Sequence, residues 1–178
     1  MRVQKWASLF PALCMLSVSA FGQSSNSSFQ ASIIGSVPNL TIGGVSSAGA
    51  SWTVSQSNVS IQPNNQNSWD IQVQVQNLLL ASGTGVGTTG SVRAVAASVV
   101  CGGSGGAVAA TTAGAVLDRS GAAQIQTTVN LPRSCRAPVV LVRVANPGAA
   151  LGAFIASTGL TLSSPNSAAD NGSHSEDQ

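Results

Sequence analysis

The sequence is poor in the side chains that perform most enzymatic chemistry. It has no tyrosine and one histidine, and only 7% of its residues are charged. That histidine, His174, lies in a polar stretch over residues 163–178 that lacks bulky apolar side chains, so we expect a disordered tail there. Because no rigid surroundings would orient the imidazole, we expect neither a Ser-His-Asp nor a Cys-His catalytic site.

Carboxylates are also scarce ahead of this tail, where Asp70 and Asp118 are the only ones. Asp70 falls on the polar side of a strand pattern, and Asp118 begins a turn, where Asp often bonds to nearby backbone groups. A hydrolase that uses Asp70 and Asp118 as an acid–base pair is therefore a remote alternative. We predict no catalytic residue, no cofactor and no metal site, because the sequence has no His cluster, acidic loop or closely spaced Cys set.

The N-terminus predicts a secretory signal peptide over residues 1–22. Arg2 and Lys5 form a basic start, an apolar stretch follows, and small residues precede two possible cleavage points. Cleavage after Gly22 is preferred because a polar run begins there, and cleavage after Ala20 stays open. The apolar stretch is too short to span about 30 Å of hydrocarbon. We therefore expect a secreted or periplasmic protein without a membrane span after cleavage.

The mature protein would carry no net charge. Five arginines balance five Asp and Glu residues once residues 1–22 are removed, and neither lysine nor methionine remains. No basic surface for nucleic acid is predicted, so no nucleic-acid partner is expected. The polar surface must consist of Ser, Thr, Asn and Gln, which leaves few charges to discourage association between strand edges.

Two cysteines remain after cleavage, Cys101 and Cys135, and in an oxidising compartment an even pair is most simply a disulfide. Such a bridge closes a loop of about 34 residues and would stabilise the fold by about 3–4 kcal/mol. A reactive or metal-binding thiol pair would instead need a neighbouring histidine or a tight Cys-x-x-Cys spacing. Neither is present, so we predict a structural bridge.

The clearest structural pattern is the alternation of apolar and polar residues with period two. In residues 69–76, four apolar side chains fall on one side, and Asp70 and three Gln residues fall on the other. Residues 124–131 alternate similarly, up to Pro132, which cannot donate a hydrogen bond to a strand ladder. Both stretches predict half-buried strands.

Further strands are expected along the rest of the chain. Residues 91–101 and 139–145 are more uniformly apolar than the alternating strands, as expected of strands buried on both faces. Residues 56–58 are expected to form a hairpin turn, and residues 107–115 allow one helical turn. The remaining expected strands cover residues 29–34, 40–45, 52–55, 59–62 and 154–157.

This spacing predicts an all-β fold, either a single antiparallel β-sandwich or a partly open barrel, with one disulfide. The β domain is expected over residues 29–162, and residues 23–28 are expected to form a polar linker.

Two small groups of side chains are candidates for a ligand surface. Arg133 and Arg136 fall in one predicted turn, where they could face an anionic ligand or simply keep a strand edge from pairing. Trp52 and Trp69 could stack on sugar rings if they were exposed. However, Trp69 begins the inward side of its strand, which favours core packing.

Two segments carry a resemblance to known sequences: residues 91–103, Ser-Val-Arg-Ala-Val-Ala-Ala-Ser-Val-Val-Cys-Gly-Gly, and residues 128–143, Thr-Val-Asn-Leu-Pro-Arg-Ser-Cys-Arg-Ala-Pro-Val-Val-Leu-Val-Arg. They resemble uncharacterised exported proteins of soil-type bacteria, which are predicted to be β-rich and have no assigned activity. The resemblance extends over residues 29–162. It implies export and the pairing of Cys101 with Cys135, and it implies no functional site.

The sequence thus predicts an exported, non-catalytic structural or interaction module at the cell exterior, with an extracellular protein or a glycan as its partner. The alternative is a carbohydrate-binding module that uses Trp52 or Trp69. The exposure of the two tryptophans distinguishes these hypotheses, since a stacking platform must be open to solvent.

Overall fold

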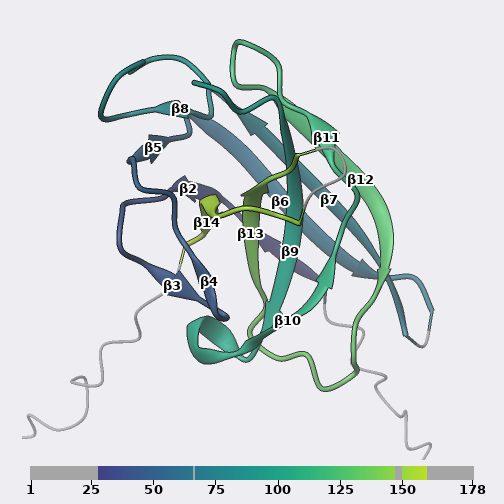
Figure 1. The fold of residues 1–178 in the computed structure, drawn as a ribbon. Helices are drawn as coiled ribbons and strands as arrows, with labels where there is room; N and C mark the ends of the chain where they lie inside the picture. The colour runs from purple at the N-terminus through teal and green to yellow at the C-terminus, as the bar shows by residue number, and fades with distance from the viewer. Residues whose placement is uncertain (1–27, 66, 147–149, 160–178) are drawn as a thin grey trace, which may run out of the picture.

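Two β-sheets stack face to face in the structure, a computed structural model that describes residues 28–65, 67–146 and 150–159 (Figure 1). These residues contain no α-helix, and their strands run from Phe29 to Thr158, within the β domain expected from the sequence. The expected signal peptide and tail, and all but one residue of the linker, lie outside the described residues.

Sheet A has four antiparallel strands in the order β1–β6–β7–β12. Their bounds are β1 Phe29–Ala31, β6 Gln56–Pro63, β7 Ser68–Gln76 and β12 Ala123–Asn130. The two strands predicted from period-two alternation, β7 and β12, are confirmed and pair with each other. Their register sets Val73 beside Ile125, so the apolar sides of both strands point into the molecule together.

Sheet B has the order β10–β9–β13–β14–β2, and β11 pairs with β9 on the same side as β10. All of its ladders are antiparallel, and an isolated parallel bridge joins Ser47 to Phe154. The bounds are β2 Ile33–Gly35, β9 Ala94–Cys101, β10 Ala107–Thr111, β11 Ala115–Val116, β13 Val139–Val144 and β14 Phe154–Thr158.

Two short pairs complete the described strands: β3 (Thr41–Ile42) with β4 (Val45–Ser46), and β5 (Trp52–Thr53) with β8 (Leu79–Leu80). No ladder joins β12 of sheet A to sheet B, so the described strands form a sandwich and no closed barrel. The all-β prediction is confirmed.

The main core fills the space between the sheets. Val59 and Ile71 of sheet A and Val95 and Val140 of sheet B are completely buried there. Each such side chain stabilises the folded state by about 1.5–3 kcal/mol relative to an exposed one. The inward half of every period-two strand therefore holds the two sheets together.

A smaller core lies on the other side of sheet B, under the β3–β4 hairpin. Val100, Leu141 and Phe154 of sheet B pack there with Ile42 of the hairpin. The strands β9 and β13 are consequently buried on both faces, as their mostly apolar sequences predicted. Gly43 permits the close approach, because a Cβ at this position would lie 2.6 Å from a methyl carbon of Val100.

The first predicted strand, residues 29–34, is divided between the two sheets. Its first part, β1, pairs with β6 in sheet A, and after Ser32 the chain enters sheet B, where β2 pairs with β14. Residues 29–35 thus contribute one strand to each sheet and connect the two sheets along one side of the sandwich.

The hairpin predicted through residues 56–58 is wrong. Gln56 and Asn58 continue the alternation of β6, with both side chains exposed, and the strand β5 pairs with β8 instead. The turn-like composition of residues 56–58 therefore reflects a solvent-facing strand. Residues 107–115 likewise form the strands β10 and β11 rather than a helical turn.

The disulfide between Cys101 and Cys135 is confirmed, with a Cα–Cα distance of 4.9 Å. It ties the end of β9 to the loop between β12 and β13. Two main-chain hydrogen bonds accompany it: the Gly102 N–H donates to the Arg136 carbonyl at 2.8 Å, and the Gly103 N–H donates to the Ala137 carbonyl at 3.1 Å. The bridge and these bonds fix the loop against the Gly-rich turn that follows β9.

Candidate binding face of sheet A

The outer side of sheet A, called the amide face below, is covered by uncharged polar side chains. Strand alternation places them there, because every second residue of β1, β6, β7 and β12 points away from the core. With one carboxylate among them, the members are Gln30, Gln56, Asn58, Ser60, Gln62, Asp70, Gln72, Gln74, Gln76, Gln124, Gln126, Thr128 and Asn130.

The register of the strands arranges these side chains in rows. Gln74 of β7 lies between Asn58 of β6 and Gln124 of β12. The next row sets Gln72 between Ser60 and Gln126. Neighbouring strands are about 4.8 Å apart, so the amide groups form a regular two-dimensional array.

Most of these amides have no partner within the described chain. The side chains of Gln72, Gln74, Gln76, Gln124 and Gln126 make no hydrogen bond to any described residue, whereas the Gln62 amide donates to the Ser60 hydroxyl at 3.2 Å. Each free amide offers two N–H donors and a carbonyl acceptor. The face therefore presents a dense set of unused hydrogen-bonding groups to solvent.

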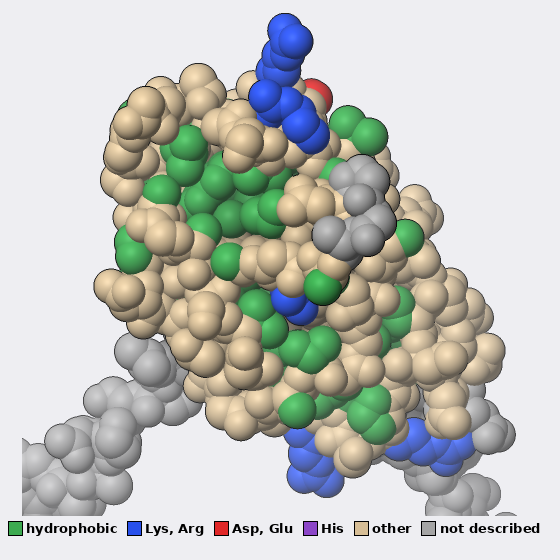
Figure 2. Space-filling view, viewed as in Figure 1, with side chains coloured by type: hydrophobic (Ala, Val, Ile, Leu, Met, Phe, Trp, Pro, Cys, Tyr) green, Lys and Arg blue, Asp and Glu red, His purple; other side chains and the backbone are tan. Residues whose placement is uncertain are grey.

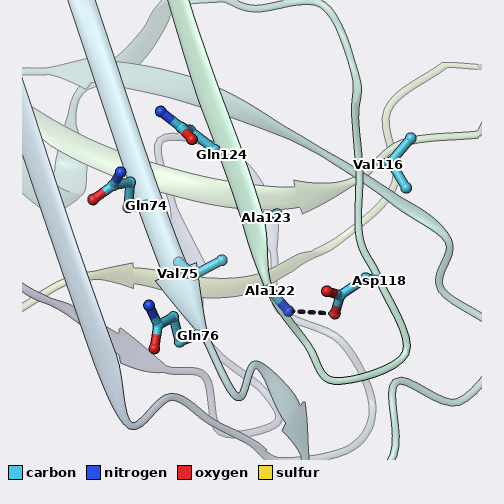
Figure 3. A pocket seen from close by; sticks show the side chains of 8 residues that line it. All are labelled: Gln74, Val75, Gln76, Val116, Asp118, Ala122, Ala123 and Gln124. Carbon is cyan, nitrogen blue, oxygen red and sulfur yellow. Dashed lines mark hydrogen bonds between the residues drawn. The ribbon is translucent and has the colours of Figure 1, made fainter.

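A shallow depression of about 370 Å³ lies at one end of this face (Figure 3). Figure 3 shows amide side chains of β7 and β12 on one side of it and Val116 and Asp118 on the other. Val116 is 78% exposed, which is unusual for a large apolar side chain. The full lining is Gln74, Val75, Gln76, Val116, Asp118, Ala122, Ala123 and Gln124.

Asp118 supplies the negative charge at the depression. Its carboxylate accepts hydrogen bonds from the Ser120 hydroxyl at 2.6 Å and the Ala122 N–H at 2.8 Å. These bonds, that of Ser120 foremost, lower the pKa of Asp118 below its usual value. The group is ionised at neutral pH and closes the turn between β11 and β12, as expected for Asp at the start of a turn.

Asp70 lies at the other end of the amide face. Its carboxylate accepts hydrogen bonds from the Asn64 amide at 3.1 Å and the Thr128 hydroxyl at 2.6 Å. It is six positions before Gln76, which lines the depression, and this spacing corresponds to roughly 20 Å along a strand. A glycosidase pair stands about 5–9.5 Å apart, so the structure does not bring Asp70 and Asp118 together as such a pair.

The two tryptophan side chains of the described residues lie in the main core or against it. Trp52 is 7% exposed and belongs to the main core, and Trp69 is half-buried and packs against it. The indole N–H groups of both are buried and have no hydrogen-bond acceptor in the structure. Neither ring offers an open platform for stacking on a sugar.

Arg133 and Arg136 are exposed on the loop that carries Cys135. This loop follows the end of β12 opposite to the depression, so the structure separates the two arginines from it. Arg143 is held differently: it is half-buried on sheet B and donates to the carbonyls of Gly152 and Leu151 at 2.9 and 2.8 Å. Partial burial lowers the pKa of Arg143.

The sequence alone did not single out the amide face. Its signal was present as the alternate Gln residues of residues 69–76 and 124–131, but these were assigned only to the solvent side of two separate strands. Strand order makes them neighbours. The face of the molecule seen in Figure 2 differs, because hydrophobic side chains gather in a hollow there.

The described residues contain no group of three or more His, Cys, Asp and Glu side chains placed to hold a metal ion. Among the same residues, no helix is long and apolar enough to cross a membrane. No family model matches the chain, and neither curated proteins nor solved structures give a significant match.

Proposed function

We propose that this protein is an exported, non-catalytic interaction module that binds a neutral polysaccharide at the cell exterior through the amide face. The observation that carries the proposal is the array of exposed amides without internal partners, centred on Gln72, Gln74, Gln124 and Gln126. Amides both donate and accept hydrogen bonds, as sugar hydroxyls do, so the two surfaces can match at many points.

Charge and polarity favour a neutral glycan over a protein partner. The amide face carries one carboxylate, Asp70, which is already bonded to Asn64 and Thr128. Protein interfaces usually bury a centre rich in aromatic and apolar side chains, and this face has no such centre. The depression adds the apolar side chain of Val116 beside its amides, which suits the mixed polar and apolar surface of a sugar ring.

The residues proposed to bind carbohydrate are thus the amides of sheet A and not the two tryptophans. Trp52 and Trp69 serve the core, so binding would rest on hydrogen bonds rather than on ring stacking. Tryptophan fluorescence should therefore stay unchanged when a glycan binds, whereas a stacking site would shift it.

The test is co-sedimentation of the mature protein with insoluble neutral polysaccharides: cellulose, chitin and starch granules. We expect binding to at least one of them, and Gln74→Ala with Gln124→Ala should weaken it about tenfold, since two hydrogen bonds contribute about 0.5–1.5 kcal/mol each. The control pair Thr41→Ala with Ser46→Ala lies on the exposed β3–β4 hairpin and should bind normally. No co-sedimentation, or equal binding by both pairs, would overturn the proposal.

A further inference from the structure

The strand β12 forms an open edge of sheet A, and its main-chain groups can be assigned to one side or the other. Leu131 donates its N–H to the Asn67 carbonyl on the β7 side, whereas Ala122 bonds through both its N–H and its C=O to Asp118 on the opposite side. Main-chain groups alternate in direction along a strand. The N–H and C=O groups of Gln124, Gln126, Thr128 and Asn130 therefore point away from β7.

Nothing in the described chain pairs with these groups. The edge strands of sheet B, β10 and β11, come close to β12 without any ladder between them (Figure 1). The inward side chains Thr127 and Val129 are only half-buried, so the gap beside this edge is open. A row of unpaired main-chain N–H and C=O groups can pair with another strand.

The usual protection against such pairing is missing on β12. Its eight residues, Ala123–Asn130, include no charged residue and no proline. Charge also gives no long-range barrier between two copies, because the mature sequence has equal numbers of positive and negative side chains. The edge can therefore meet an identical edge without repulsion.

We propose that β12 pairs with β12 of a second copy, in antiparallel orientation about a two-fold axis at Thr127. Gln124 then lies opposite Asn130 of the second copy, and Gln126 lies opposite Thr128. This register uses every outward-facing main-chain group of the strand, giving about eight hydrogen bonds between the copies. It is isologous, so it closes after two copies and does not extend into a fibre.

The pairing joins two four-stranded sheets into one continuous eight-stranded sheet. The two amide faces become one surface. On the inward side, Thr127 meets Thr127 of the second copy, and Val129 lies opposite its Ile125. This inference does not depend on the proposed glycan, because the edge and its pairing exist whatever the amide face binds.

The test is the molar mass of the oxidised mature protein, measured by light scattering over a range of concentrations. We expect the mass to approach that of two chains as the concentration rises. In hydrogen exchange, the amides of Gln124, Gln126 and Thr128 should exchange fast when dilute and slowly when concentrated, because pairing buries them.

A matched pair of variants separates edge pairing from a general effect of charge. Gln124→Lys with Gln126→Lys places four ammonium groups at the seam and should give a monomer with unchanged circular dichroism. Gln72→Lys with Gln74→Lys adds the same charges to the same face one strand inward, where about 0.15 M salt screens them. That control should still dimerise.

A wild-type protein that stays monomeric at all concentrations would overturn the inference, as would a dimer that both variants leave intact. A monomer with slowly exchanging edge amides would also overturn it, by showing that another part of the same chain covers β12. Glycan co-sedimentation is scored separately, so failure of one proposal is distinguishable from failure of the other.

Discussion

The Ser57 hydroxyl bridges both main-chain groups of Ile33. It accepts a hydrogen bond from the Ile33 N–H at 2.7 Å and donates one to the Ile33 carbonyl at 3.0 Å. Ser57 belongs to sheet A and Ile33 to sheet B, so one side chain connects the two sheets beside the crossing at Ser32. Ile33 is 4% exposed, which leaves little access for water to replace the bonds.

Ser57→Ala should therefore destabilise the protein by about 1–3 kcal/mol, since it leaves buried main-chain groups unpaired. The measurement is the free energy of unfolding in a denaturant titration. Ser91→Ala is the control, because Ser91 is exposed and its side chain makes no hydrogen bond within the described chain. Equal stability of the two variants would contradict the role assigned to Ser57.

Removal of the disulfide by Cys101→Ser with Cys135→Ser should cost about 2–4 kcal/mol. Aggregation should accompany the loss of stability, because few charges guard the strand edges. Thermal unfolding of the wild type in reducing buffer should reproduce the effect without any substitution. A double variant that melts within about 2 °C of the wild type would mean that the bridge contributes well under 1 kcal/mol.

Two glycines with similar backbone conformations should respond differently to alanine. Gly121 has φ +80° and a Cβ there would lie 2.5 Å from the Leu78 nitrogen, whereas Gly44 has φ +75° and open space around it. Gly44→Ala should cost about 1–2 kcal/mol for the left-handed conformation alone. Gly121→Ala should cost a further ~1–3 kcal/mol for the clash, so equal losses in chemical denaturation would refute this account.

The carboxyl group of Asp118 should titrate below the ordinary pKa of about 3.9, as followed by NMR of its side-chain carbon. Its folded-state pKa is lowered, chiefly by the Ser120 hydroxyl and next by the Ala122 N–H. The resulting stabilisation is complete above the unfolded-state pKa and is lost as the pH falls through the folded-state pKa. Ser120→Ala should raise the titration midpoint, and Ser91→Ala should leave it unchanged.

The sequence predicted the strands that local alternation decides. β7 and β12 follow their period-two patterns closely, because the apolar face of a strand this long is stable only when it packs against a core. β9 and β13 were also recognised as buried on both faces. Their outer cover, the β3–β4 hairpin, was expected only as a single strand over residues 40–45, since its turn depends on the two glycines Gly43 and Gly44.

Local sequence patterns did not predict which strands pair with each other. Nothing within residues 52–62 indicates that Trp52 pairs with Leu80, because that pairing is decided by contacts distant in sequence. The amide face could not be predicted for the same reason. Gln74 and Gln124 are fifty residues apart along the chain and become neighbours only through the ladder between β7 and β12. The depression further requires the placement of Val116 and Asp118 beside them.

The pairing of β2 with β14 has a consequence for the order in which this chain can fold. Residues 33–35 lie near the start of the described chain, yet their partners are residues 156–158 of β14, the last strand that the structure describes. Sheet B therefore stays incomplete until residues 156–158 are available, and contacts so far apart in sequence form slowly. Until then, β13 is paired only with β9 and has one open edge, and the segment after Ser32 lacks its partner strand in sheet B. A chain that stops before Phe154 would remain in that state.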